Sequence, residues 1–377
     1  MKMRKIVAIL LTAALTLSLV ACAATPAPAA APAEPAAAAE EAAEEKEEAA
    51  APAGTVDPKS ITIACSVYQQ DAHQSLIRQG VIDAAAEYGV NCLTTVTDSD
   101  VAKELEFLTT CTSQGVQGYV WAPCGTAAVG PLSEAKDAGA YVSIVNGLPS
   151  GTDLPVDPVA YFDGNFYNNS QSMCDTLGEV VKPNLEEVFA DNIESGEPLK
   201  IGIIAFDALS KEVSDDRANA ILDKLDELGI KYDIVSRQDA VEQDKAIEVS
   251  QGMLTAEPNL DLFVSCCESA SIGAITTVVN EKKQGQCYVA GIDTSVQIAK
   301  LMVENPDVGL AFVGQSSYDG GYQAAVQIIK LCLGIDPEET AAKQGKENSL
   351  DDMILDRANP DGIQEYIDFM ASLGVTG

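Results

Sequence analysis

From Ser60 onward, short runs of β-branched and apolar residues alternate with longer amphipathic patterns, and this alternation leaves few possible folds. The short runs predict strands at Ile61–Val67, Asn91–Val96, Gly118–Trp121, Tyr141–Val145, Val159–Phe162, Lys200–Phe206, Lys231–Ser236, Leu260–Val264, Cys287–Ile292 and Gly309–Val313. The longer segments predict helices at Gln74–Tyr88, Asp100–Ser113, Ala127–Ala138, Asn165–Asn184, Val213–Leu228, Val241–Ala256, Glu268–Glu281, Thr294–Glu304 and Ser317–Leu333. Such alternation favours an α/β fold in which helices cover both faces of parallel sheets.

The series of strands and helices runs once to about Asp163 and starts again at Lys200, which predicts two similar lobes. After the second series, we expect a surface loop or short helix over 334–349, a last strand at Leu350–Leu355 and a closing helix at Pro360–Leu373. Open parallel sheets bind ligands beyond the carboxyl ends of their strands, so two facing lobes would share a ligand cleft.

The N-terminus has the features of an export signal. Three basic residues within Met1–Lys5 precede an apolar run over 6–20, which is too short to span a membrane as a mature helix. The sequence Leu-Val-Ala-Cys that ends at Cys22 resembles the lipobox of bacterial lipoproteins. We therefore expect a signal peptide over 1–21, lipidation of Cys22, an Ala/Pro/Glu-rich linker over 22–57 and an extracytoplasmic protein anchored to the cell membrane. The alternative is an ordinary secretory signal with a chance cysteine.

Charge and cysteine content exclude several classes of partner. The formal net charge of −34 argues against nucleic acid and against binding anionic lipid through the protein surface, so the lipid on Cys22 would provide the membrane attachment. Besides Cys22, an odd number of cysteines is scattered through apolar segments, which is not the pattern of a disulfide framework. We expect these thiols, including the pair Cys266 and Cys267, to fill space in the core.

The sequence offers little support for catalysis. It contains one histidine, no CxxC zinc spacing, and none of the GxSxG, HExxH or phosphate-cradling motifs. We therefore predict no enzymatic activity, no metal site and no cofactor. The remaining enzymatic alternative is a glycosidase that uses the carboxylate pair Glu268 and Asp293.

Several segments between about Ser60 and Leu333 carry a family resemblance. The segment KSITIACSVYQQDAHQSLIRQGVIDAAAEYGVN, followed by DDRANAI, SCCESASIGA, VAGIDTS and LAFVGQSSYDGGYQAA, resembles periplasmic sugar-binding proteins of the ribose- and galactose-binding type. The resemblance implies two Rossmann-like lobes with parallel sheets, joined by a three-strand hinge. It implies an N-terminal lobe of 58–163 plus about 316–343 and a C-terminal lobe of 164–315 plus about 344–377.

The resemblance also implies three ligand-binding residues. Arg217 matches the ligand arginine of the family, Asp293 its hydroxyl-binding aspartate, and Gln315 the glutamine of its crossover segment. Their chemistry suits a sugar, because arginine offers a fork of donors, an ionised aspartate accepts two hydrogen bonds, and glutamine does both. For each residue alone, a salt bridge or other structural contact is the alternative.

Other positions depart from the family and make the expected cleft more polar. His73 and Gln74 replace two stacking aromatic residues, Asn146 and Gly147 replace an Asp-Arg pair, and Cys267 replaces an asparagine. The further candidate ligand residues are Tyr68, Gln69, Gln70, Asp71, His73, Gln74, Asn146, Asp163, Cys267 and Glu268. Trp121 could stack on a ligand or lie in the core.

These patterns together predict a lipid-anchored, monomeric solute-binding protein that delivers a small sugar or sugar-like ligand to the permease of an ABC importer. A nucleoside, a polyol or a furanose-like signal remains open as the ligand, and a membrane sensor remains open as the partner. The export signal, and the lack of a basic helix-turn-helix before Ser60, argue against a transcription regulator of the related fold.

Overall fold

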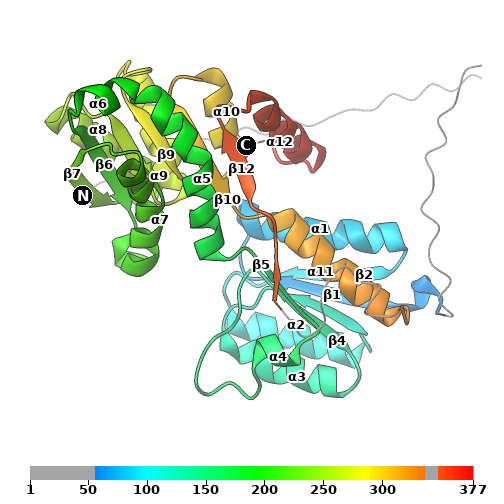
Figure 1. The fold of residues 1–377 in the computed structure, drawn as a ribbon. Coiled ribbons are helices and arrows are strands. Elements are labelled where there is room, and N and C mark those ends of the chain that lie inside the picture. The colour runs from blue at the N-terminus through cyan, green and yellow to red at the C-terminus, as the bar shows by residue number, and fades with distance from the viewer. Residues whose placement is uncertain (1–55, 336–346, 377) are drawn as a thin grey trace, which may run out of the picture. The chain divides into compact units, whose positions relative to one another are not determined.

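Two six-stranded sheets organise the chain, and a computed structural model describes residues 56–335 and 347–376 of it (Figure 1). The first sheet has the order β11-β5-β4-β3-β1-β2 and the second the order β12-β10-β9-β8-β6-β7. The strands are β1 (Thr62–Val67), β2 (Asn91–Val96), β3 (Gly118–Trp121), β4 (Tyr141–Val145), β5 (Gly164–Tyr167), β6 (Leu199–Ala205), β7 (Tyr232–Asp239), β8 (Leu262–Ser265), β9 (Tyr288–Ile292), β10 (Gly309–Gly314), β11 (Glu347–Ser349) and β12 (Met353–Asp356). All neighbouring strands pair in parallel except β10 and β12, which pair antiparallel.

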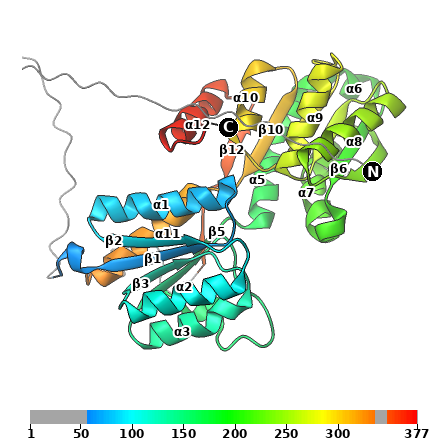
Figure 2. The same cartoon turned by 180° about the vertical axis from the view of Figure 1, so that it is seen from behind.

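Helices cover both faces of each sheet (Figures 1 and 2). The helices of the first lobe are α1 (Ala72–Tyr88), α2 (Val101–Ser113), α3 (Val129–Asp137), α4 (Pro158–Tyr161) and α11 (Ser317–Cys332). The helices of the second lobe are α5 (Ser170–Val188), α6 (Ala190–Ser195), α7 (Asp207–Glu227), α8 (Gln243–Ala256), α9 (Glu268–Asn280), α10 (Val296–Glu304) and α12 (Pro360–Ser372). Short 3₁₀ turns lie at Pro58–Ser60 and Thr126–Ala128. The structure thus confirms the prediction of two α/β lobes with mainly parallel sheets.

Helix α1 shows how the local sequence determines these elements. Asp71 caps its N-terminus, because the Asp71 carboxylate accepts a hydrogen bond from the backbone N–H of Gln74 at 2.7 Å. Gly89 ends the helix in the left-handed conformation, with a φ of 69°. Ile77 and Val81 fall on one face of the helix and are buried against the first sheet. This helix leads directly from the carboxyl end of β1 into the region where a ligand is expected.

Helices α1 and α11 cross unusually closely on one face of the first sheet. A Cβ atom added at Gly321 would lie 2.0 Å from the carbonyl oxygen of Ile77, and one added at Gly80 would lie 2.2 Å from that of Tyr318. Only glycine at these two positions allows the backbones to approach so far. The crossing positions the N-terminus of α11, which carries residues of the candidate site described below.

The chain passes between the sheets three times: after β5, after β10, and between β11 and β12. Asn168 links all three crossovers. Its Oδ1 accepts a hydrogen bond from the backbone N–H of Ser316 at 2.9 Å. Its Nδ2 donates to the carbonyl oxygens of Leu350 at 3.3 Å and Asp351 at 3.2 Å, and to Asp352 Oδ1 at 2.9 Å. One amide side chain therefore holds the three connections together.

The fifth strand differs from its prediction. Val159–Phe162 was expected to be a strand, but Pro158–Tyr161 forms α4, because Asp157 caps the N-terminus and proline suits the first helical position. The strand β5 follows at Gly164–Tyr167, where the sequence predicted the start of a helix. Since β5 and β11 both join the first sheet, the lobe boundaries expected at 163 and about 344 lie at later residues.

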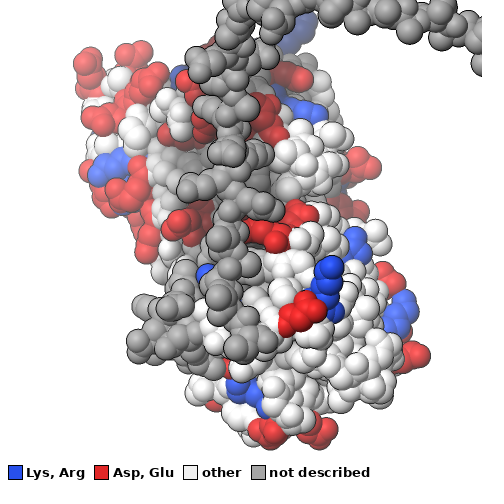
Figure 3. Space-filling view, turned by 90° about the vertical axis from the view of Figure 1, so that its right-hand side faces the viewer, with Lys and Arg blue, Asp and Glu red and all other residues white. Residues whose placement is uncertain are grey.

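Acidic side chains are common on the surface, and the thiols lie in the core only in part: Cys65, Cys111, Cys174, Cys266 and Cys287 are buried, whereas Cys92, Cys124, Cys267 and Cys332 are half-buried. Acidic side chains gather over the upper part of the face in Figure 3, where basic side chains are few. The nine cysteines in the described residues are free thiols, and burial raises the pKa of Cys266 to about 12, so it stays protonated. Within the described residues, no group of His, Cys, Asp or Glu side chains is arranged to hold a metal ion.

The predictions for the N-terminus lie outside the described residues. These are the signal peptide over 1–21, the lipidated Cys22 and nearly all of the linker over 22–57. Most of the insertion predicted over 334–349 also lies outside them. None of the helices in the described part of the chain is long and apolar enough to cross a membrane.

Candidate functional site

The carboxyl ends of the strands in both sheets contribute to one cavity of about 230 Å³. His73, at the start of α1, and Ser317, at the start of α11, line it from the first lobe. Glu268, at the start of α9, and Asp293, directly after β9, line it from the second lobe. Gln315 lines it from the crossover that follows β10. Four residues predicted from the sequence, His73, Glu268, Asp293 and Gln315, therefore meet at one site.

A chain of hydrogen bonds holds His73 in place on the first-lobe side. Its Nδ1 is paired with the hydroxyl of Ser317 and its Nε2 with Oδ1 of Asn146. Because a carbonyl oxygen can only accept, Nε2 donates to Asn146, and the Ser317 hydroxyl is the partner of Nδ1. Nδ2 of Asn146 in turn donates to the hydroxyl oxygen of Tyr68 at 3.2 Å. Burial raises the pKa of Tyr68, so this residue remains a neutral hydroxyl.

On the second-lobe side, Arg217 and Asp293 are brought together from different elements. Nη1 of Arg217, on α7, donates to the carbonyl oxygen of Cys266 at 2.8 Å and lies 3.4 Å from Oδ2 of Asp293. The guanidinium carbon also lies 5.3 Å from the centre of the Phe206 ring, within cation–π range. Nε of Arg217 is buried and has no hydrogen-bond partner among the described residues. Arg217 thus supports Asp293 from behind and does not itself line the cavity.

Glu268 adds a second carboxylate to the cavity wall. Its backbone N–H donates to Oδ2 of Asp293 at 3.2 Å, and its carboxylate is hydrogen-bonded by the side chain of Ser295. Burial raises the pKa of Glu268, and the negative charges of Asp293 and Asp71 raise it further. These contacts place two carboxylates, Glu268 and Asp293, side by side on one wall.

Helix α12 forms a wall that the sequence did not predict. Tyr366 and Met370, on α12, and Val375, just beyond it, line the cavity together with Leu76 of α1. The hydroxyl of Tyr366 is hydrogen-bonded to the side chain of Thr294, and burial raises the Tyr366 pKa to about 12. The apolar spacing of the closing helix was a signal of burial, but the sequence gave no indication of which cavity this helix would line.

Asp163 does not belong to this site. It precedes β5 and therefore lies at the amino end of the strand, opposite the edge that faces the cavity. Asp163 is fully buried, its Oδ1 lies 2.7 Å from Nζ of Lys136, and its Oδ2 accepts from the backbone N–H of Val142 at 2.8 Å. The prediction that Asp163 contacts a ligand came from the family resemblance, and in the structure its carboxylate contacts Lys136 and Val142 instead.

Other predicted residues lie outside the cavity lining. Gln70 is exposed in the loop before α1, and Cys267 is half-buried, with its thiol 3.7 Å from the carbonyl oxygen of Ala240. Gln74 is fully buried, and its side-chain amide has no partner among the described residues. Trp121 is a core residue, since its ring is fully buried and Nε1 donates to Oε1 of Glu104 at 2.9 Å.

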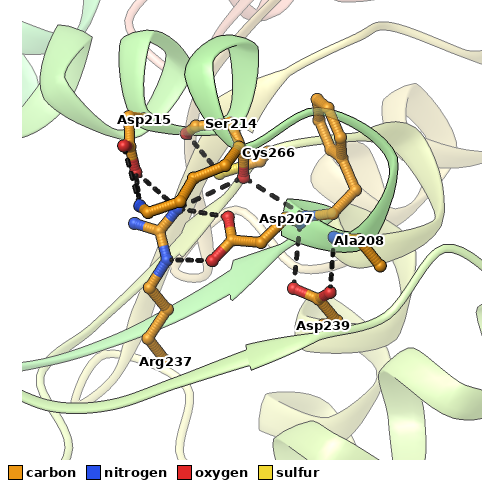
Figure 4. Close-up of polar contacts among 9 residues, drawn as sticks. Asp207, Ala208, Ser214, Asp215, Arg237, Asp239 and Cys266 are labelled. Carbon is orange, nitrogen blue, oxygen red and sulfur yellow. Dashed lines mark hydrogen bonds and ion pairs between the residues drawn. The ribbon is translucent and has the colours of Figure 1, made fainter.

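A network of charged residues fixes the loop between β6 and α7, and sequence reasoning missed it (Figure 4). Nε and Nη2 of Arg237 lie 2.9 and 2.5 Å from the two carboxylate oxygens of Asp207, and Nη2 lies 2.8 Å from Asp215. Asp239 accepts from the backbone N–H groups of Asp207 and Ala208 at 2.9 and 2.8 Å. The arginine fork lowers the Asp207 pKa. This network orients the beginning of the helix that carries Arg217.

Comparison with solved structures establishes the fold. The periplasmic ribose ABC transporter protein of Conexibacter woesei matches with a TM-score of 0.63 at 13% identity, over 86% of this chain and 99% of its own. A D-allose-bound solute-binding protein of Actinobacillus succinogenes matches with a TM-score of 0.61 at 16% identity, over 81% of this chain and 100% of its own. Two α/β lobes with three crossovers therefore define a type I periplasmic binding protein fold, as the sequence predicted.

Sequence comparison identifies the family. The family model described as a periplasmic binding protein domain matches residues 61–336, and the chain belongs to this family. The ABC transporter periplasmic-binding protein YphF of Escherichia coli (strain K12) is 24% identical over 276 residues, which cover 72% of this chain and 80% of YphF. The protein is thus an extracytoplasmic solute-binding protein, which confirms the prediction that it is not an enzyme.

Proposed function

We propose that this protein captures a small sugar or sugar-like polyol between its two lobes and delivers it to an ABC importer. The observation that carries the proposal is the convergence of His73, Glu268, Asp293 and Gln315 on one cavity. These side chains come from both lobes and from a crossover, so a solute in the cavity would contact all three. The D-allose- and ribose-related proteins with the same fold support a sugar as the solute.

The chemistry of the cavity suits vicinal hydroxyl groups. The Asp293 carboxylate can accept two hydrogen bonds, and Gln315 can donate and accept at once. The cavity of about 230 Å³ is smaller than most ligand clefts, which measure roughly 300–1,000 Å³, so it favours a small solute. Leu76 and Met370 provide apolar surface that can cover the carbon skeleton of such a solute. A myo-inositol-binding protein of Caulobacter has the same fold (TM-score 0.56, 18% identity, 81% of this chain and 94% of its own), which supports including polyols.

The three crossovers supply the mechanism of the proposed function. A solute that binds residues of both lobes favours the conformation in which those residues are close together. Asn168 ties the three crossovers to one another, so a change in their conformation would be concerted. The liganded conformation would then be the form that the permease recognises.

A thermal-shift panel tests the proposal. Pentoses, hexoses and inositols would be added to the purified protein, and a ligand at 100 times its dissociation constant should add about 2.7 kcal/mol of stability. Asp293→Asn should weaken binding of the best ligand at least tenfold. Asp307→Asn, at an exposed position, is the matched control and should bind normally. The proposal fails if no member of the panel stabilises the protein, or if Asp293→Asn binds as tightly as the native chain.

We also propose a monomer that is attached to the membrane through lipid on Cys22. Cells given a labelled fatty acid should incorporate it into the native chain and into Cys92→Ala, but not into Cys22→Ala. The Cys22→Ala protein should be retained with its signal peptide or released from the membrane. Light scattering of the purified protein should give the mass of one chain.

A further inference from the structure

Glu268 differs from Asp293, the other carboxylate at the cavity, because the described part of the chain supplies no counter-ion for it. Asp293 lies 3.4 Å from the guanidinium of Arg217, whereas no Lys or Arg of the described residues forms an ion pair with Glu268. Among the described residues, the side chain that hydrogen-bonds its carboxylate is the neutral Ser295. Because Glu268 is partly buried, water can only partly replace the missing counter-ion.

The described side chains that act on the Glu268 carboxylate are two carboxylates and two hydroxyls. Asp293 and Asp71 are close enough for their negative charges to raise the Glu268 pKa. Tyr366 faces Glu268 from α12, and its high pKa keeps it uncharged. His73 uses both ring nitrogens for Ser317 and Asn146, so neither nitrogen is paired with Glu268. In the described structure, no Lys or Arg of the first lobe forms an ion pair with Glu268 or Asp293.

The rest of the cavity limits where a compensating charge could sit. Leu76, Met370 and Val375 form an apolar wall that suits the carbon side of a solute. A positive charge on the solute would therefore lie at the wall of Glu268 and Asp293. An ammonium group has three donors and no acceptor, and the two carboxylates and Oε1 of Gln315 supply acceptors on that side.

We infer that the solute carries a protonated amine that pairs with Glu268, which makes amino sugars and aminocyclitols the ligand class. This inference rests on the proposed function and narrows it. A neutral sugar would give Glu268 hydrogen bonds but no counter-ion, whereas an ammonium group forms charge-assisted hydrogen bonds, which are roughly twice as strong as neutral ones. Arg217 remains the partner of Asp293, so one carboxylate of the pair is available for the ligand.

Matched pairs of sugars test the inference by calorimetric titration of the purified protein. The pairs are D-glucosamine with D-glucose, D-galactosamine with D-galactose, and D-mannosamine with D-mannose. The titrations are done near pH 6.5, below the usual pKa of such amines, which resembles the roughly 7.7–8.0 of an α-amino group. For at least one pair, the amine should bind at least tenfold more tightly, and acetylation of the amine should remove this advantage.

Two variants distinguish an effect of Glu268 on amine binding from an effect of the overall negative charge of the protein. Glu268→Gln should reduce the preference for the amine to less than threefold while binding of the neutral sugar persists. Glu281→Gln removes the same charge beyond the opposite end of α9 and should keep the full preference. Circular dichroism would verify that both variants fold.

Each remaining outcome decides between the two proposals. Binding of neutral sugars as tightly as their amines, or a preference that survives Glu268→Gln, overturns the inference and leaves the proposed function intact. If neither the sugars nor their amines bind, and the wider panel of pentoses and inositols also fails, the proposed function itself is overturned.

Discussion

Replacing Gly321 by alanine should destabilise the first lobe, although alanine normally stabilises a helix. The new Cβ would lie 2.0 Å from the carbonyl oxygen of Ile77. Since carbon and oxygen atoms in contact lie more than 3 Å apart, α1 and α11 would have to separate by about 1 Å or more. Overpacking of this kind costs about 1–3 kcal/mol, and backbone atoms cannot rotate away, so the upper end applies. The higher helix propensity of alanine offsets about 1 kcal/mol of this cost, so the free energy of unfolding should fall by about 2 kcal/mol.

Gly252→Ala is the matched control, because it makes the same change inside another helix. Gly252 is exposed on α8, and an added Cβ would have no atom within 4 Å. The one remaining effect is the higher helix propensity of alanine, so the free energy of unfolding of this variant should rise by about 0.5–1 kcal/mol. The two substitutions are chemically identical and should change stability in opposite directions.

Trp121 fluorescence during urea unfolding measures the effect in the correct lobe. Trp121 is the one tryptophan of the chain and lies buried in the first lobe, which also contains the α1–α11 crossing. A lobe-specific probe matters because a protein of two lobes need not unfold in a single two-state step. A Gly321→Ala protein that is as stable as the native chain would show that the helices do not cross as closely as described, and the packing argument would be wrong.

Three further predictions test the hinge, the titration of the cavity and the boundary of the site. Asn168→Ala removes the amide that joins the crossovers. Ligand affinity should therefore change, although Asn168 does not line the cavity. X-ray scattering in solution should show that the change in shape on ligand binding differs from that of the native chain. The pKa of Glu268 is raised above its ordinary 4.5, so its protonated form favours folding. Stability without ligand should therefore fall as the pH rises from 4.5 through the raised pKa. Glu268→Gln should flatten this part of the pH profile of stability measured by urea unfolding. Asp163→Ala should cost about 3 kcal/mol, because it leaves Lys136 and Val142 unpaired, with no change in ligand affinity by calorimetry.

The sequence predicted most elements because their signals are local. Strands β2, β3 and β4 have the predicted ends, since β-branched runs there are bounded by helix caps or glycine. The failure at Val159–Phe162 has a local cause as well. The apolar composition of that segment suits a strand, but the Asp157 cap and Pro158 favour a helical turn at the same place. From the sequence alone, the strand signal and the helix signal of this segment cannot be ranked, because the contacts with the neighbouring strands are not known.

The candidate site was less predictable because it depends on long-range contacts. The family resemblance brought Arg217 and Asp293 to one site, and the structure puts them in contact. It gave no information on α12, because the resemblance ends at about Leu333 and the wall formed by Tyr366 and Met370 follows it. Whether a polar side chain near the cavity lines it depends on the direction in which the side chain points. For this reason Glu268 lines the cavity and its neighbour Cys267 does not.

The two lobes use the same backbone device at the ends of equivalent strands. Asn146 directly follows β4 and Asp293 directly follows β9, which hold the same position in the strand orders of the two sheets. Both residues have left-handed backbone angles, with φ of 75° and 76°. Glycine, asparagine and aspartate adopt this conformation most readily, and Asn146 and Asp293 each bring a side chain that also binds polar groups. His73 is hydrogen-bonded to Asn146, and the backbone N–H of Glu268 to Asp293, so substitutions at positions 73 and 268 can change which solute is bound while the backbone of each lobe is preserved.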